Sequence, residues 1–491
     1  GIELQHNFTD RFKVLARANV DGYTDERKSM FPIFSADNAG NGLATEDGIS
    51  HRQFNVDLMG IGNVNLTDDL KLDYTVGVNT AEINTNFRGG SYQTFLINTT
   101  KFAYSNSLLA NRTTYLNENN TRTNAAFVST SLNYRDFLNA NIGARAETSS
   151  ALDPNLKTYV YPSVELSYLF THHLKSDVLT NGKLRATFGQ VSIMPAIYAG
   201  STYITGAGGS ESWGPGYNAG AYGGGYEAES LAGNPLLRPE LKTQYELGVE
   251  LGFLNRLNFG LTVYTDKTKD NLVSAALNPS SSFSSTYGNF AEVQNKGLEI
   301  DFDYAILKDT QFKWNVSANF GLNRNEVTAL GGSSSILLNG FTGTSSRAVL
   351  NQPLGVLWGG RFARDTAGKL VLDANGFPTA APTEGVIGDP NPNFRAGLSN
   401  MISYKGLSLN VLFDASVGGD VWDGTNGALN VFGKTPETAN ILNLTATEAA
   451  ALKGSNGATA LSQGWLNPDG TYSVRGNIVD YGAGPRLANE S

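Results

Sequence analysis

Apolar and polar residues alternate along many segments of the chain with a period of two. Between 245 and 253, every odd position is apolar or aromatic and every even position is glutamate or glycine. Alternate side chains of a β-strand point to opposite faces, so this pattern predicts strands with one apolar and one polar face. Each such segment is about ten residues long, the length with which a tilted strand crosses a bilayer. The same period recurs at 70–79, 138–147, 298–306, 312–322 and 407–417.

The connections between these segments fall into two classes of length. Short polar turns are expected at 9–11, 67–69, 135–136, 255–256, 308–310 and 405–406, with a longer polar turn at 171–182. Long connections are expected at 24–52, 86–124, 196–241, 266–292 and 328–392. Seven hairpins of this kind give about fourteen strands.

Long connections at one end and short turns at the other are typical of an outer-membrane barrel. The predicted fold is therefore all-β, a transmembrane antiparallel β-barrel with long extracellular loops and short periplasmic turns. The strands of a soluble sandwich or solenoid also have alternating apolar and polar residues, but such a fold would not place its long loops so consistently at one end. Acidic side chains are costly against lipid and stable in a wet lumen, so they define the inward face. They are Glu165, Glu246, Glu250, Glu299, Asp301, Asp303 and Asp414.

The composition of the 491 residues agrees with an envelope protein. Charged residues make up 16%, below the roughly 25% usual for soluble domains. There is no cysteine, which rules out disulfides and thiolate metal sites. The net charge of −9 argues against nucleic acid as a partner, because phosphates require a basic surface.

Several motifs resemble those of TonB-dependent outer-membrane receptors. The segment 234–251, NPLLRPELKTQYELGVEL, resembles the stretch in which Asn-Pro-x-Leu-x-Pro-Glu precedes a barrel strand. The segment 292–307, EVQNKGLEIDFDYAIL, resembles a strand opened by Asn-x-Gly-x-Glu. Two further segments narrow the resemblance to the SusC/RagA branch of Bacteroidota. They are YPSVELSY (161–168) and GDPNPNFRAGLSNMISYKGLSLNVLFDASVGGDVWDGT (388–425).

The resemblance implies a complete barrel of about 22 strands with an N-terminal plug. It also implies a SusD-like surface lipoprotein as lid and energy from TonB–ExbB–ExbD, coupled through the N-terminal part. Residues 1–491 show no signal peptide, plug or TonB box, and about fourteen strands are fewer than 22. We therefore expect 1–491 to be a partial outer-membrane barrel domain, with the plug and the last strands outside this chain.

Aromatic residues in the presumed outer loops are the candidate ligand-binding residues. The loop 196–230 places aromatic rings among many glycines. Flat rings stack on the C–H faces of sugars, so this loop is a candidate glycan platform; the alternative is a surface loop that packs against the lid or the plug. The candidates are Tyr198, Trp213, Tyr217 and Tyr226 in this loop, and Trp358 and Trp422 in other presumed loops.

No motif points to catalysis, a cofactor or a metal. Asp365, Asp373 and Asn375 lack the spacing of a calcium loop and fit hairpin turns instead. His172 and His173 are adjacent in a turn, which makes a shared metal difficult. The four histidines suggest no hydrolytic triad, so we do not expect an enzyme.

The expected function is import across the bacterial outer membrane, in contact with its lipid. The cargo is expected to be an oligosaccharide or a peptide, taken up with the SusD-like lid. Two alternatives remain open: a passive porin-like channel, or a barrel that serves as a structural or assembly partner in a larger envelope complex.

Overall fold

The computed structural model divides the chain into two compact units. The first comprises Gly1–Arg324 and Ala396–Asp414, and the second Asn325–Arg395 and Ala415–Ser491. The described residues are all except 36, 153–157, 207–225, 309, 342, 375, 433, 437–439, 453–464, 481–485 and 489–491. Among them, no helix is long and apolar enough to cross a membrane.

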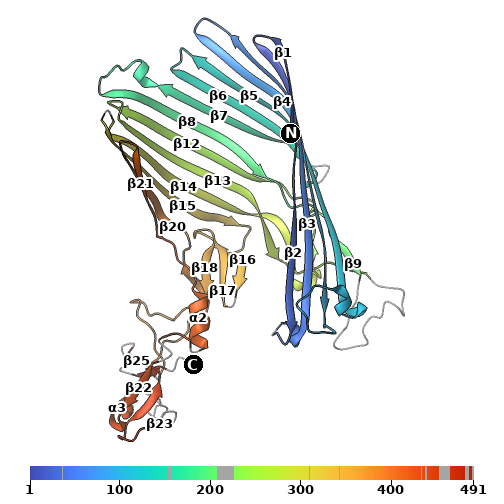
Figure 1. Ribbon diagram of the computed structural model, residues 1–491, viewed down its shortest axis with the longest axis vertical. Coiled ribbons are helices and arrows are strands. Elements are labelled where there is room, and N and C mark those ends of the chain that lie inside the picture. The colour runs from blue at the N-terminus through green and yellow to red at the C-terminus, as the bar shows by residue number, and fades with distance from the viewer. Residues whose placement is uncertain are drawn as a thin grey trace. The chain divides into compact units, whose positions relative to one another are not determined.

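One large sheet forms most of the first unit (Figure 1). Fourteen of its fifteen strands follow one another in chain order, and the remaining one, β11 (Leu231–Ala232), pairs in parallel with β14. The fourteen are β1 (Ile2–Thr9), β2 (Phe12–Ile33), β3 (Asn41–Asn65), β4 (Leu70–Gln93), β5 (Arg112–Tyr134), β6 (Leu138–Ser149), β7 (Tyr159–Leu169), β8 (Leu179–Ile193), β12 (Glu240–Phe253), β13 (Leu257–Ala276), β14 (Ser285–Leu307), β15 (Phe312–Leu330), β20 (Pro392–Tyr404) and β21 (Leu407–Gly418). The prediction of about fourteen strands is confirmed.

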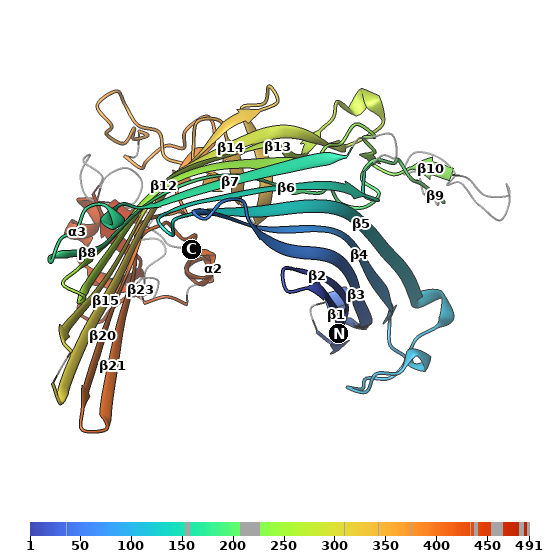
Figure 2. The ribbon, with the colours of Figure 1, turned by 90° about the horizontal axis from the view of Figure 1, so that it is seen from above.

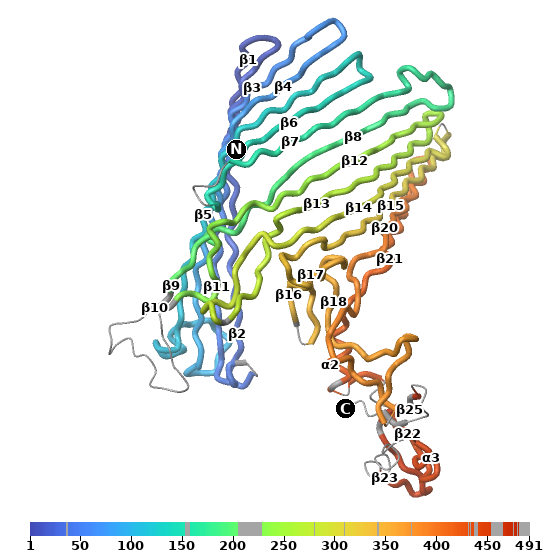
Figure 3. Tube along the Cα trace, turned by 180° about the vertical axis from the view of Figure 1, so that it is seen from behind, coloured from blue at the N-terminus to red at the C-terminus, as the bar shows by residue number. Residues whose placement is uncertain are grey.

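Strands that are neighbours in this sheet from β1 to β14 pair antiparallel. Figure 2 shows that the sheet of the first unit is curved, and Figure 3 shows its strands following one another in order. The short turns lie where the sequence predicted them. For example, β3 ends at Asn65 and β4 begins at Leu70.

The predicted lengths of strands and long loops are wrong. Strand β3 has 25 residues and β4 has 24, so most of the predicted loops 24–52 and 86–124 belong to continuous strand ladders. Most of 266–292 is also strand. Outside the membrane both faces of a strand contact water, so nothing imposes alternation there. Charged residues such as Arg27 and Lys28 follow one another, and the sequence pattern fades although the backbone pairing continues.

The register places the apolar positions of neighbouring strands side by side. One row across four strands consists of Leu166, Ala186, Leu247 and Val263. Leu247 is 61% exposed in the chain by itself, as expected for a side chain that contacts lipid. The adjacent row on the other face consists of Glu165, Thr187, Glu246 and Tyr264. The predicted division into an apolar and a polar face is confirmed.

Aromatic rings gather where the short turns join the sheet. Phe137 stacks on the His172 ring with centroids 4.7 Å apart and meets the His173 ring edge-on at 4.6 Å. The Tyr168 hydroxyl lies 3.1 Å from His173 Nδ1. Aromatic residues favour the membrane–water boundary, so this cluster marks the short-turn edge of the apolar band.

Smaller elements fill the longer connections. In the first unit they are β9 (Ile204–Gly206), which pairs with β10 (Tyr226–Ala228), and the 3-10 turns η1 (Asp37–Gly40), η2 (Tyr104–Asn106), η3 (Leu109–Asn111), η4 (Phe170–His172) and η5 (Pro279–Ser281). The second unit contains a four-stranded sheet of β16 (Ser335–Phe341), β17 (Thr344–Val349), β18 (Val356–Gly359) and β19 (Gly385–Gly388). These strands lie within the predicted loop 328–392 and occupy about a third of it.

The rest of the second unit has a small core of its own. Helix α3 (Ala446–Ala450) begins with a capping box in which Thr445 and Glu448 bond each other's backbone. It packs Ala449 against Leu444 and Val474. The remaining elements are α2 (Gly424–Val431), β22 (Ile441–Leu444), β23 (Trp465–Leu466), β24 (Tyr472–Arg475), β25 (Asn477–Val479) and β26 (Arg486–Ala488).

Candidate functional site

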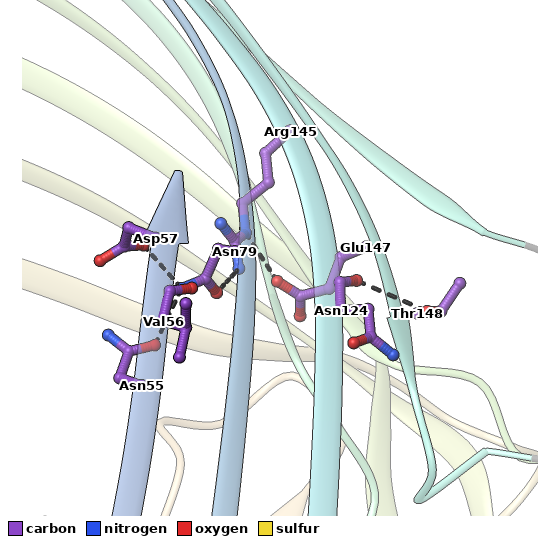
Figure 4. Close-up of polar contacts among 8 residues, drawn as sticks. All are labelled: Asn55, Val56, Asp57, Asn79, Asn124, Arg145, Glu147 and Thr148. Atoms are coloured by element: carbon purple, nitrogen blue, oxygen red, sulfur yellow. Dashed lines mark hydrogen bonds and ion pairs between the residues drawn. The ribbon is translucent and has the colours of Figure 1, made fainter. Parts of the chain in front are cut away.

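A hydrogen-bonded network crosses the polar face of the first unit from β3 to β6 (Figure 4). The Asn79 amide donates to Asn55 Oδ1 and to Asp57 Oδ1, both at 2.8 Å. Arg145 Nη2 donates to Asn79 Oδ1 at 3.4 Å, and Arg145 Nε donates to Glu147 Oε2 at 2.6 Å. The Glu147 side chain is only 15% exposed, so its charge is well shielded from bulk water. The network is a fixed arrangement of donors and acceptors.

This network borders a hollow of about 840 Å³ on the same part of the sheet. Small residues leave the space open. Gly143 and Ser163 both line the hollow, and Gly143 lies beside Ser163. A hollow with amide, carboxylate and guanidinium groups at its edge can bind peptide groups or sugar hydroxyls, because both need donors and acceptors.

A second polar cluster lies further along the same face, on β8, β12 and β13. Glu250 forms ion pairs with two basic side chains. Arg185 Nε lies 2.8 Å from Glu250 Oε1, and Lys183 Nζ lies 3.6 Å from Glu250 Oε2. Arg185 Nη2 also donates to Thr262 Oγ1 at 3.1 Å. Gly248, directly opposite Arg185, makes room for the guanidinium. The cluster thus carries one more positive than negative charge.

A third cluster surrounds Asp266, which is 4% exposed. Lys242 Nζ lies 3.3 Å from Asp266 Oδ2, and the Asn295 amide donates to Asp266 Oδ1 at 2.9 Å. Asn323 donates to Asn295, and the Tyr264 hydroxyl donates to Asn323 Oδ1 at 3.2 Å. The inner face therefore carries three polar clusters, each held together by its own hydrogen bonds and ion pairs.

Sequence reasoning missed Arg145, Asn79, Arg185 and Lys183 as possible site residues. Each occupies a polar position of an alternating strand, which was the only signal available. Their grouping depends on register between strands, which single-sequence alternation does not specify.

The predicted aromatic platform is described only in part. Tyr198 is 50% exposed, and its ring meets that of Tyr203 edge-on with centroids 6.1 Å apart. Trp213 and Tyr217 lie outside the described residues. Tyr226 is the first residue of β10, and its backbone pairs with that of Gly206. The Tyr226 side chain is not among the parts of the chain that the structure describes. A ligand-binding role for these residues stays a prediction.

The two predicted tryptophans belong to the second unit, whereas Tyr198 belongs to the first. Trp358 lies in β18, where its Nε1 donates to Glu384 Oε2 at 3.1 Å and the Arg347 guanidinium lies 5.4 Å from its ring centroid. Trp422 precedes α2 and is 38% exposed, with its ring against Gly424.

Asp365 and Asp373 form hairpin turns, as the sequence predicted. Asp365 Oδ1 accepts from the Ala367 and Lys369 amides at 2.8 and 2.9 Å. Asp373 Oδ1 accepts from the Phe377 amide at 2.8 Å. Across the described residues, no group of three or more acidic or histidine side chains is arranged to hold a metal ion.

Comparisons with known proteins agree with the geometry. The family model described as TonB dependent receptor-like, beta-barrel matches residues 1–447. TonB-dependent receptor P3 of Formosa agariphila is 29% identical over 333 residues, which cover 61% of this chain and 32% of that protein. TonB-dependent receptor SusC of Bacteroides thetaiotaomicron is 32% identical over 101 residues, which cover 20% of this chain and 10% of that protein.

Solved structures show the same fold. The RagAB peptide transporter superposes with a TM-score of 0.70 at 21% identity, over 84% of this chain and 46% of that one. The open-open state of the RagAB peptide importer also gives 0.70, at 18% identity, over 98% of this chain and 51% of that one. The predicted likeness to SusC and RagA is thus confirmed, and the chain spans about a third of the curated relative P3. Because the family model covers 447 of 491 residues and the fold agrees, this chain belongs to the TonB-dependent receptor-like β-barrel family, whose members are outer-membrane proteins and not enzymes.

Proposed function

We propose that this chain is the barrel part of an importer that carries oligosaccharides or peptides across the outer membrane. It acts with a SusD-like lipoprotein as lid and draws energy from the TonB system. The observation that carries the proposal is the set of hydrogen-bonded polar clusters along the inner face, on a fold shared with the RagAB peptide transporter.

The polar wall suits a hydrated cargo. Its side chains form hydrogen bonds and ion pairs with one another. As cargo passes, hydrogen bonds to the cargo replace these bonds, so no charged side chain is left unpaired. Asn79 and Arg145 present donors, and Asp57 and Glu147 present acceptors. The likeness to the RagAB peptide transporter favours peptides as the cargo class. The aromatic residues of the loop 196–230 favour sugars.

The first test measures uptake and its energy source in cells that carry the complete receptor. We expect labelled oligopeptides or oligosaccharides to enter only when the proton-motive force is intact. The receptor purified in mild detergent should retain a lipoprotein of the mass of a SusD-like lid, identified by mass spectrometry. Uptake that persists without the proton-motive force would favour a passive channel. A retained envelope complex with no uptake would favour a structural role.

The second test concerns the aromatic loop. Replacing Trp213, Tyr217 and Tyr226 together by alanine should lower cargo affinity about tenfold, because each ring offers a large apolar face at little entropic cost. The control is Phe34→Ala, which removes an 87%-exposed ring from the connection between β2 and β3. Cargo binding and lid retention are measured on the same preparation. Loss of the lid with unchanged cargo affinity would assign the loop to docking; no change in either would remove both roles.

A further inference from the structure

The outward, apolar face of the first unit contains a hollow of about 790 Å³. Its walls include Leu166, Phe188, Tyr245, Leu247 and Val263. The hollow exists because Ala186 is short, whereas its cross-strand neighbours Leu166 and Leu247 are long. Its surface is overwhelmingly apolar, so it accepts a hydrocarbon chain and offers water few hydrogen bonds.

Lys296 of β14 also lines this hollow. It is exposed, and among the described residues it makes no ion pair or hydrogen bond. Lys267, the next lysine towards the long loops on the same face, differs because it pairs with Glu292. The register also places Lys296 at a boundary. Its row continues through Thr265, the rings of Tyr245 and Phe188, and Val164, and the next row towards the short turns is wholly apolar.

The height of Lys296 places it at the outer edge of the membrane. It lies eleven residues before Leu307, where β14 ends at a short turn. At about 3.3 Å per residue and a tilt of about 45°, this is a rise of roughly 26 Å, close to the 25 Å height of the apolar band. Tyr245 and Phe188, whose ring centroids are 5.2 Å apart, lie in the same row, as expected of the outer aromatic girdle.

We propose that Lys296 and the hollow beneath it form a binding site for one lipopolysaccharide molecule of the outer leaflet. The Lys296 ammonium binds a phosphate of the lipid, because it is the cation at this level without an acidic partner among the described residues. An acyl chain lies in the hollow over Ala186, between Leu166 and Leu247. Charge complementarity and the apolar surface directly below it identify the occupant. The site does not depend on the proposed import function.

The test is native mass spectrometry of the complete receptor, extracted from its own outer membrane in mild detergent. Wild-type receptor should carry one bound lipopolysaccharide. Lys296→Gln should lower the bound fraction about tenfold, the value expected when one charge-assisted hydrogen bond is lost. Lys267→Gln, on the same face and the neighbouring strand, should retain the lipid because Glu292 already neutralises Lys267. Equal retention by both variants, or equal loss, would overturn the proposal.

A second pair of variants tests the hollow. Ala186→Phe fills the space and should also displace the lipid, whereas Ala126→Phe, outward on β5, should leave it bound. Heat-modifiability on gels confirms that each variant is folded. A mass that identifies a phospholipid in place of lipopolysaccharide, or retention of the lipid by Ala186→Phe, would contradict the assignment.

Discussion

Ala186→Arg is expected to destabilise the barrel by about 1 kcal/mol, because Ala186 lies just inside the outer edge of the apolar band, whereas Thr187→Arg is expected to be tolerated. The two positions are adjacent in β8 and face opposite sides of the sheet. Ala186 lies between Leu166 and Leu247, where a guanidinium would have to enter the hydrocarbon. Thr187 lies between Glu165 and Glu246, so an arginine there would meet two carboxylates in a hydrated interior.

Urea-dependent folding of the complete receptor into lipid vesicles measures this difference. Outer-membrane yield in cells gives a second readout. The adjacent pair controls for backbone and strand effects, because both substitutions introduce the same side chain into the same strand. Similar losses at 186 and 187 would show that the assigned faces of β8 are wrong.

Gly297→Ala is the second large expected effect, a loss of about 1–3 kcal/mol. Gly297 is the glycine of the Asn-x-Gly-x-Glu segment, and the Tyr264 ring lies directly over it. A Cβ at this position would overlap that ring. Tyr264 would have to move and give up its 3.2 Å hydrogen bond to Asn323, which belongs to the cluster around Asp266.

Gly321→Ala is the matched control for this prediction. Gly321 lies in β15, and a Cβ there would meet no atom within 4 Å. We expect no loss of stability, or a gain of about 0.4–1 kcal/mol from the less flexible unfolded chain. Chemical unfolding of both variants in vesicles gives the comparison. If Gly297→Ala were as stable as Gly321→Ala, the packing of Tyr264 on the glycine would carry no energy.

The sequence predicted the short turns and the faces of the strands well. Lipid contacts one face and water the other, so each membrane-spanning strand records its orientation in its own alternation. The segment 245–253 is an example: Leu247 and Glu246 lie on the faces that the pattern assigned. The motifs at 234–251 and 292–307 likewise led to the family that the comparisons show.

The sequence failed where the membrane no longer imposes a pattern. The ladder between β4 and β5 continues up to Tyr92 and Arg112, well inside the predicted loop 86–124. There, backbone hydrogen bonds maintain the strand pairing. These bonds do not require apolar and polar side chains to alternate, so the sequence shows no period of two. The candidate tryptophans are a second example of what the sequence did not predict. The sequence identified Trp358 as an aromatic residue in a presumed loop, but it did not indicate that Trp358 contacts Glu384 and Arg347 in the second unit.

The sequence by itself determined three properties of this protein. Its alternation identified the membrane-spanning strands of a barrel and the residues of each strand that face lipid, and its motifs identified the family that it resembles. Only the tertiary structure decided which polar residues act together, and that Lys296 has no ion pair among the described residues. Arg145 reaches Asn79, and Arg185 reaches Glu250, because the register of the sheet brings distant segments to the same level. Alternation within one strand fixes a face, whereas the partner across the sheet depends on how far each strand slides against its neighbour before the backbone bonds close.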